Sequence, residues 1–221
     1  MLPPAPYAPP ADTGLDVRHA DDALVVVDKP AGLLSAPGRG PDKQDCLLAR
    51  LQRQFPDALI VHRLDMDTSG LLVFARGAEM HRRLSRQFRD RQVEKRYLAV
   101  VAGLVALESG AIDLPLICDW PNRPRQKVDA ALGKASFTRY RRLGGDGPGG
   151  TCRLELTPVT GRSHQLRVHL EAIGHPIVGD PLYGTPASRA KASRLLLHAS
   201  RLAFAHPAGG EWLAWESAAP F

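Results

Sequence analysis

Apolar residues in this chain occur in short runs joined by short polar connections, a pattern that favours strands and short helices over long ones. Runs rich in β-branched residues predict strands within 22–38, where a turn separates two of them, and at 58–62, 71–76, 95–103, 151–161 and 194–207. Apolar residues at helical spacing predict helices at 45–55, 78–91 and 162–174. Because helices and strands alternate irregularly, we expect an α+β fold with a mixed, mostly antiparallel sheet flanked by helices and loops.

The caps of the last predicted helix can be assigned from its ends. Ser163 is a suitable N-cap and Gly174 a C-terminal stop, with Leu166, His169, Leu170 and Ile173 on the buried face. A glycine-rich tip at 144–150 precedes the strand at 151–161, and we expect it to be flexible.

The 221 residues are enough for one large domain or for two small lobes around a shared core. Five of the first ten residues are proline, so residues 1–20 are predicted to form an extended, poorly packed arm before a single domain at 21–221. No apolar run approaches the ~20 residues that cross a bilayer, and the N-terminus lacks the features of a signal peptide. We therefore expect a cytoplasmic protein that does not associate with membranes.

Cysteines are few and widely spaced. Cys46, Cys118 and Cys152 form no CxxC pair, so they predict structural thiols and neither a disulfide framework nor a zinc site.

Positive charge is concentrated in three clusters. The formal net charge is +6, and the clusters lie at 82–96, at 123–127 and at 139–142. Each cluster taken alone is typical of a solvated surface, but together they favour a nucleic acid as partner.

Two aspartates lie on a short loop between predicted strands, in "ALIVHRLDMDTSGLLVFAR" at 58–76. Three interpretations compete. Asp65 and Asp67 fit the DxDxT signature of magnesium-dependent phosphoryl transfer, but polar residues precede them and Asp180 has no carboxylate neighbour in the sequence. Asp65 could instead be a nucleophile or base acting on a bound nucleic acid, kept ionised by the adjacent arginine. The third interpretation is a solvated turn. The chain contains no P-loop, GxGxxG, HExxH or GxSxG motif.

Five stretches resemble motifs of the RluA family of pseudouridine synthases. They are "DKPAGLL", "HRLDMDTSG", "EKRYLA", "TGRSHQLRVHL" followed by "GHPIVGDPLYG", and "LLLHASRLAFAHP". The resemblance covers nearly the whole chain. It implies a pseudouridine synthase fold with a central catalytic cleft, no S4 domain, and an isomerase that needs no cofactor and no metal. The stretch "LPLICDWPNRPRQKV" further resembles family members with dual specificity, which implies a tRNA anticodon stem-loop and a 23S ribosomal RNA hairpin as partners.

The resemblance also implies catalytic roles. Asp65 would be the nucleophile, and Tyr97 would stack on the target base or act as general base. Arg162 would offset the desolvation of the carboxylate, and Leu166 would form the apolar floor of the base pocket. The alternatives are a core aromatic for Tyr97, a phosphate contact for Arg162 and plain helix core for Leu166. Asp67 receives no catalytic role.

Other residues are candidates for holding the RNA. Arg63 would fill the gap left by an extruded uridine, or alternatively contact a phosphate, and His62 would orient the loop. The remaining predicted RNA contacts are Arg83, Arg86, Arg123 and Arg125. Two other functions stay open: a family member with a different RNA target, and a catalytically inactive RNA-binding relative. We expect a monomer that does not bind DNA.

Overall fold

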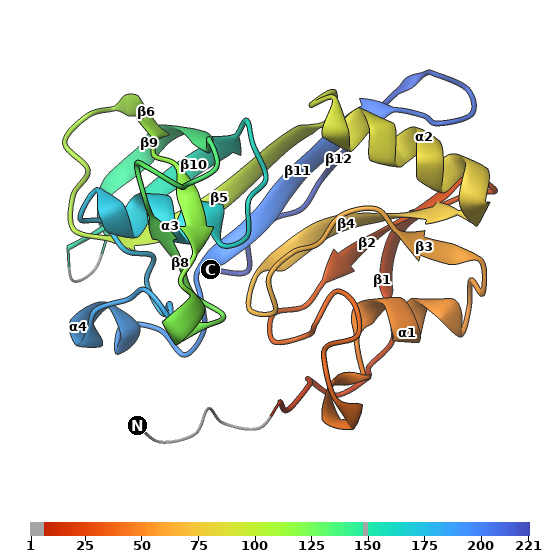
Figure 1. Ribbon diagram of the computed structural model, residues 1–221, viewed down its shortest axis with the longest axis horizontal. Coiled ribbons are helices and arrows are strands. Elements are labelled where there is room, and N and C mark those ends of the chain that lie inside the picture. The colour runs from red at the N-terminus through yellow and green to blue at the C-terminus, as the bar shows by residue number, and fades with distance from the viewer. Residues whose placement is uncertain (1–6, 148–149) are drawn as a thin grey trace. The chain divides into compact units, whose positions relative to one another are not determined.

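The computed structural model describes residues 7–147 and 150–221, which form two compact units. The first unit comprises the described residues up to Val93 together with Leu202–Ser217, and the second comprises Glu94–Arg201 together with Ala218–Phe221. Strands dominate both units and short helices accompany them, so the predicted α+β class is confirmed (Figure 1). The predicted division into residues 1–20 and 21–221 stays a prediction.

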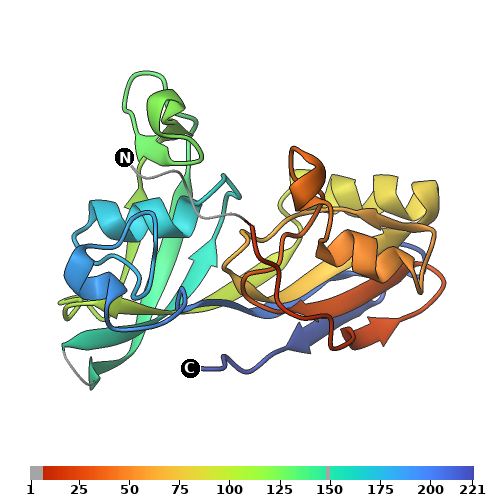
Figure 2. The ribbon, with the colours of Figure 1, turned by 90° about the horizontal axis from the view of Figure 1, so that it is seen from below.

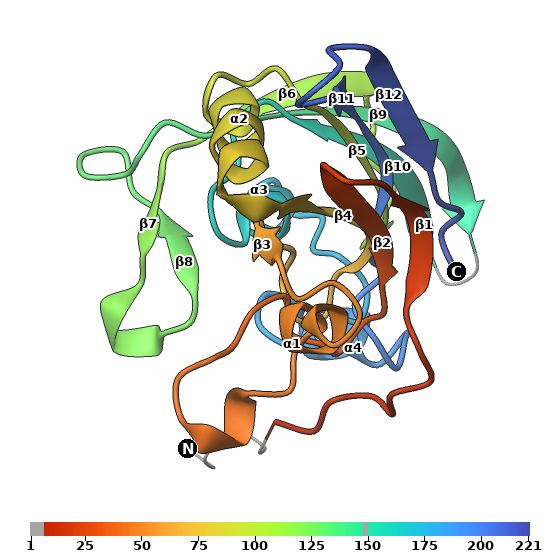
Figure 3. The same ribbon diagram turned by 90° about the vertical axis from the view of Figure 1, so that its right-hand side faces the viewer.

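The sheet of the first unit is built around two buried strands, β2 (Leu24–Lys29) and β4 (Ser69–Arg76). Its strand order is β1 (Asp16–Ala20), β2, β4 and the end of β11 (Leu197–Ala205), with β3 (Ala58–Ile60) paired with β4 and β12 (Trp212–Glu216) paired with β11. Figure 3 shows β1, β2 and β4 side by side, and their pairings are antiparallel. The register of β2 and β4 pairs Lys29 with Gly70, so the end of β2 lies beside the start of β4.

Two α-helices belong to the first unit, α1 (Leu47–Gln52) and α2 (Gly77–Arg89), and a 3₁₀ turn occupies Pro41–Lys43. Along α2, Met80, Leu84 and Phe88 recur every four residues and pack against a core cluster that includes residues of β2 and β4, whereas the arginines of the helix are exposed. The helix predicted at 78–91 is therefore confirmed.

The sheet of the second unit continues from β11 through β5 (Glu94–Ala102), β10 (Thr151–Pro158), β9 (Phe137–Gly147) and β6 (Ser109–Asp113). A separate hairpin of β7 (Leu116–Cys118) and β8 (Gln126–Val128) carries a 3₁₀ turn at Trp120–Asn122 and projects from this unit (Figure 2). The α-helices of the second unit are α3 (Gln165–Ala172) and α4 (Pro186–Arg189). Part of the glycine-rich tip, residues 148–149, lies outside the described residues.

Three local predictions are wrong. No second strand follows the turn after β2, because the carbonyls of Leu34 and Ser35 accept bonds from the amides at the start of α1. The strand predicted at 151–161 ends at Pro158, which is consistent with the missing N–H of proline. Helix α3 begins at Gln165 and not at Ser163, since His164 adopts a left-handed conformation with φ of 54°.

Cys46, Cys118 and Cys152 are free thiols, and Cys46 and Cys152 are buried. Cys46 caps α1, because its Sγ accepts a hydrogen bond from Ala49 N. None of the helices in the described parts of the chain is long and apolar enough to cross a membrane.

Candidate active site

Asp65 lies on the connection between β3 and β4 in the first unit. The amide of Thr68 donates to the Asp65 carbonyl at 3.1 Å and closes a turn, after which Thr68 and Ser69 are buried as β4 begins. Asp65 itself is half-buried. The loop is therefore tied into the sheet, which argues against a merely solvated turn.

The residues on both sides of Asp65 are held by the segment that follows β2. Ser35 Oγ donates to the Leu64 carbonyl at 2.7 Å and accepts from the Leu64 amide at 3.1 Å. On the other side, the amide of Gly32 donates to the Met66 carbonyl at 2.9 Å. The "DKPAGLL" motif and Ser35, which directly follows it, thus contribute the scaffold on which the Asp65 backbone is fixed.

Lys29 is a candidate functional residue that sequence reasoning missed, since the stretch containing it was interpreted as a turn and as a family motif and Lys29 itself received no role. Its side chain is 0% exposed, and Nζ donates to the carbonyls of Pro30 at 2.9 Å, Leu33 at 2.7 Å and Met66 at 2.8 Å. A buried ammonium is costly unless its donors are satisfied, and three carbonyl acceptors meet that need. Lys29 therefore places a fixed positive charge next to the Asp65 loop.

We expect Lys29→Met to destabilise the protein by about 2 kcal/mol or more, because the three carbonyls lose a buried donor. Turnover should fall at least about tenfold, since Met66 is released from one of its two hydrogen bonds. Urea unfolding and single-turnover kinetics measure the two effects, with Lys191→Met, at an exposed position, as the matched control. A Lys29→Met protein as stable and active as the parent would show that the buried ammonium does not support the loop.

His62 connects the same loop to α2. Its Nε2 accepts a hydrogen bond from the Val73 amide at 3.2 Å, and its ring stacks on Phe88 with centroids 4.4 Å apart and planes at 22°. This geometry suits the predicted orienting role. Arg63, the next residue, is exposed.

The two predicted RNA contacts on α2 differ in their surroundings. Arg83 donates to Glu79 Oε1 at 2.9 Å and to the Pro207 carbonyl at 3.0 Å, so part of its donor capacity is used within the unit. Arg86, in the following turn of the helix, is exposed.

Tyr97 and Leu166 belong to the core of the second unit. Tyr97 lies half-buried on β5 opposite Leu156, and it packs against the cluster that contains Leu166. Leu166 is only 7% exposed. Leu166 is therefore a core residue of α3, as the alternative interpretation expected.

Arg162 precedes α3 in a segment fixed by the side chain of Gln165. Gln165 Oε1 accepts from the Arg162 amide at 3.0 Å and from Thr160 Oγ1 at 2.7 Å, while Nε2 donates to Thr138 Oγ1 at 3.0 Å. The Arg162 side chain is exposed, with Nε 3.4 Å from the Ala135 carbonyl. A rigid backbone with an exposed guanidinium suits binding of an anionic partner.

The β7–β8 hairpin presents Arg123 and Arg125 differently. Arg123 lies over the exposed ring of Trp120, 4.4 Å from its centroid. Arg125 donates to the Leu182 carbonyl and lies 5.0 Å from the ring centroid of Tyr183, which anchors the connection between β7 and β8. Arg123 and Trp120 are thus the more accessible pair.

Asp180 has a structural partner and does not complete a metal site. Both of its carboxylate oxygens accept from Arg167, at 2.7 and 2.8 Å, and the pair is buried. Burial alone would raise the pKa of Asp180, but the bonds and charge of Arg167 together with the amides of Leu182 and Tyr183 outweigh it and hold the pKa below its ordinary value. Across residues 7–147 and 150–221, no group of three His, Cys, Asp or Glu side chains is placed to hold a metal ion.

Comparisons with known proteins agree with these motifs. Residues 23–172 match a family described as RNA pseudouridylate synthase. Proteins named dual-specificity RNA pseudouridine synthase RluA are similar over nearly their full length: that of Yersinia pestis is 51% identical over 93% of this chain and 99% of its own, and that of Escherichia coli K12 is 49% identical over 97% and 98%.

A solved structure, human RNA Pseudouridylate Synthase Domain Containing 1, has a TM-score of 0.80 and 29% identity, and covers 97% of this chain and 87% of its own. Human RNA Pseudouridylate Synthase Domain Containing 4 has a TM-score of 0.73 and 26% identity, over 92% of this chain and 88% of its own. The predicted pseudouridine synthase fold and RluA-family resemblance are thereby confirmed.

Proposed function

Because the chain belongs to the RNA pseudouridylate synthase family, we propose that it isomerises one uridine in a tRNA anticodon stem-loop and one in a 23S ribosomal RNA hairpin. Conversion of uridine in RNA to pseudouridine is the activity of the family. The observation that carries the choice of substrates is the near full-length similarity to dual-specificity synthases. The stretch "LPLICDWPNRPRQKV", which contains the whole β7–β8 hairpin, supports the same assignment.

The reaction breaks the N1–C1′ bond of the uridine, turns the base and joins it to the sugar through C5. It has no net redox change and needs no energy input, so its chemistry calls for no cofactor. Asp65 acts as nucleophile at C1′ or at the uracil ring, or assists departure of the base. Support for this role comes from the "HRLDMDTSG" motif and from the way Ser35, Gly32 and Lys29 fix the backbone around Asp65.

Tyr97 contacts the target base or takes a proton from the sugar or ring, and Arg162 favours the ionised carboxylate. Leu166 contributes to the apolar lining of the base site. These roles rest on the motifs "EKRYLA" and "TGRSHQLRVHL", and the half-buried ring of Tyr97 and the exposed guanidinium of Arg162 are compatible with them. The enzyme acts in the cytoplasm, as a monomer.

The two substrates can be tested by mapping pseudouridine in total RNA from cells that lack the gene. We expect two sites to disappear, one in a tRNA anticodon stem-loop and one in 23S ribosomal RNA. The purified protein should restore both, with release of tritium from RNA labelled at uracil C5. Loss of a single site, or of sites elsewhere, would assign a different target, and absence of tritium release would leave an inactive RNA-binding relative.

The exposed arginines of α2 hold the RNA stem in this proposal. We expect Arg86→Gln to weaken binding to any stem-loop and to reduce the slope of log affinity against log salt by roughly 0.7–0.9, the value for one lost phosphate contact. Arg83→Gln should change the slope less, since Arg83 is already bound to Glu79 and Pro207. Filter-binding titrations at several salt concentrations measure the slopes. An unchanged slope for Arg86→Gln would mean that this arginine only faces solvent.

A further inference from the structure

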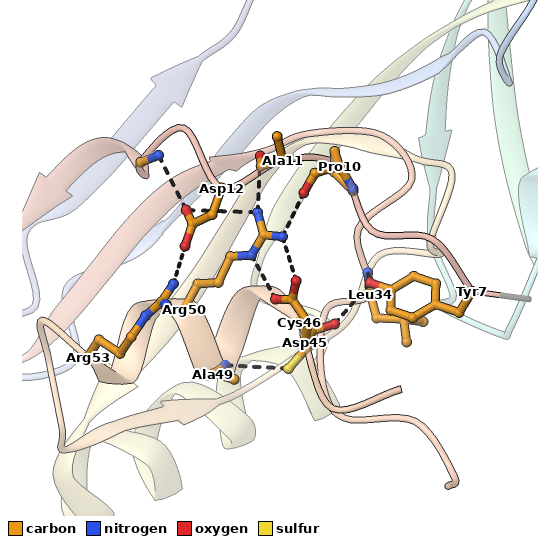
Figure 4. Close-up of polar contacts among 11 residues, drawn as sticks. Tyr7, Pro10, Ala11, Asp12, Leu34, Asp45, Cys46, Ala49, Arg50 and Arg53 are labelled. Atoms are coloured by element: carbon orange, nitrogen blue, oxygen red, sulfur yellow. Dashed lines mark hydrogen bonds and ion pairs between the residues drawn. The ribbon is translucent and has the colours of Figure 1, made fainter. Parts of the chain in front are cut away.

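Residues 7–12, named here the N-terminal strap, are bound to the first unit through Arg50 of α1. Figure 4 shows the Arg50 guanidinium between Asp45 and the strap: Nε and Nη2 donate to the two Asp45 oxygens at 2.8 and 2.7 Å, and Nη2 also donates to the Pro10 carbonyl at 2.7 Å. Nη1 lies 3.5 Å from the Ala11 carbonyl. The Arg50 side chain is only 6% exposed, whereas that of Asp45 is 45% exposed. The guanidinium is therefore largely enclosed, and its bonds to Asp45 and Pro10 are charge-assisted.

Tyr7 makes a second attachment of the strap. Its hydroxyl donates to the Asp45 carbonyl at 2.9 Å and accepts from the Leu34 amide at 3.1 Å (Figure 4). Burial raises the pKa of Tyr7, so the hydroxyl keeps its proton. One side chain thus joins the start of α1 to the segment that follows β2.

That segment is the one that fixes Asp65. Leu34 precedes Ser35, whose Oγ exchanges two hydrogen bonds with Leu64, the neighbour of Asp65. The strap also approaches Gly32, because a Cβ built on that glycine would lie 3.8 Å from Cδ of Pro10. Gly32 bonds to Met66, the other neighbour of Asp65. One short series of hydrogen bonds therefore leads from Tyr7 through Leu34 and Ser35 to Leu64, and Pro10 lies near Gly32, which is bonded to Met66.

We propose that the N-terminal strap positions the catalytic loop, with Tyr7 and Arg50 as positioning residues that act on Asp65 through the segment 32–35. This inference rests on the proposed role of Asp65. The strap residues do not need to touch RNA in this arrangement. Their effect arises because displacement of a reacting group by about 1 Å can cost about a hundredfold in rate.

Two substitutions and a matched control test the proposal. Tyr7→Phe removes the hydroxyl and keeps the ring, and Arg50→Ala removes the buried anchor. Arg53→Ala is the control, because Arg53 lies one residue beyond α1 and pairs with the strap residue Asp12, but its side chain is 63% exposed. A surface pair of this kind contributes little.

We expect both Tyr7→Phe and Arg50→Ala to lower the single-turnover rate at saturating enzyme about tenfold, measured well below their unfolding temperatures. The Kd for RNA should stay within about twofold, and hydrogen exchange of the Leu64 amide should become faster. Arg53→Ala should behave as the parent protein. A loss of general stability alone would leave the rate of the folded protein unchanged.

Parental rates in Tyr7→Phe and Arg50→Ala would overturn the proposal, as would an equal loss in Arg53→Ala. A loss in RNA affinity without a loss in rate would also overturn it, since the strap would then be an RNA contact. If Arg50→Ala does not fold, Tyr7→Phe decides. Asp65→Asn, assayed in parallel, separates failure of the proposed function from failure of the positioning role. Activity in that variant contradicts Asp65 as the nucleophile. Parental rates in the strap variants contradict only the positioning role.

Discussion

Asp65→Asn should have no detectable turnover and yet bind RNA within about tenfold of the parent protein, a difference of ~1.4 kcal/mol. Asparagine has nearly the shape of aspartate, and the contacts that fix this loop go to the backbone of Leu64 and Met66, so the loop should keep its conformation. What the substitution removes is the negative charge and the nucleophilic oxygen. Tritium release from RNA labelled at uracil C5 measures turnover, and filter binding measures affinity.

Asp67→Asn is the matched control, because it makes the same chemical change two residues along the same loop. It should keep most of the activity, since no catalytic role falls to Asp67. An active Asp65→Asn protein would remove Asp65 from the mechanism. An inactive Asp67→Asn protein with an unchanged unfolding temperature would instead favour a site that uses both carboxylates, as in the DxDxT interpretation.

The elements that sequence reasoning predicted well are those whose pattern is local. The four-residue recurrence of Met80, Leu84 and Phe88 gives α2 to within two residues at each end, because one helix face alone determines which positions are buried. The strands predicted at 58–62 and 71–76 are β3 and β4 for a similar reason. Such patterns need no knowledge of distant partners.

The features that were missed depend on partners far apart in the sequence. The burial of Lys29 requires the carbonyl of Met66, and the start of α3 depends on Gln165 bonding to Thr138 and Thr160. Ser163 is a good N-cap by composition, but it cannot compete with that network. Proline content likewise predicted a poorly packed arm, although proline removes only a donor and leaves its carbonyl free to accept. Residues 7–12 make more contacts than that prediction allowed, because Arg50 donates to the carbonyls of Pro10 and Ala11.

The candidate site follows the same division. Asp65, Tyr97 and Arg162 could be selected from motifs, because a motif records residue type and order. A motif could not show which of Arg83 and Arg86, or which of Arg123 and Arg125, is more available to contact RNA. That availability depends on whether a guanidinium is already engaged, as Arg83 is with Pro207 and Arg125 is with Leu182.

Arg63→Ala should slow modification of a well-stacked stem-loop by about tenfold to a hundredfold while changing RNA affinity much less. Burial alternates along the loop, with Arg63 exposed, Leu64 buried and Asp65 half-buried, which indicates that Arg63 and Asp65 emerge on the same side of the chain. Extruding a stacked base costs a few kcal/mol, and a planar guanidinium that occupies the vacancy recovers part of that free energy. Each ~1.4 kcal/mol recovered corresponds to a tenfold change in rate.

A substrate whose target uridine is already unstacked, for example by a flanking mismatch, separates this role from a phosphate contact. The rate defect of Arg63→Ala should shrink on that substrate, because little unstacking remains to be offset. Arg63→Lys sharpens the test, since lysine keeps the charge that binds phosphate but lacks the plane that stacks. If Arg63 fills the vacancy, lysine should rescue the stacked substrate poorly. Equal defects on both substrates together with full rescue by lysine would assign Arg63 to the phosphate backbone, and the free energy of base extrusion would then have to come from other residues.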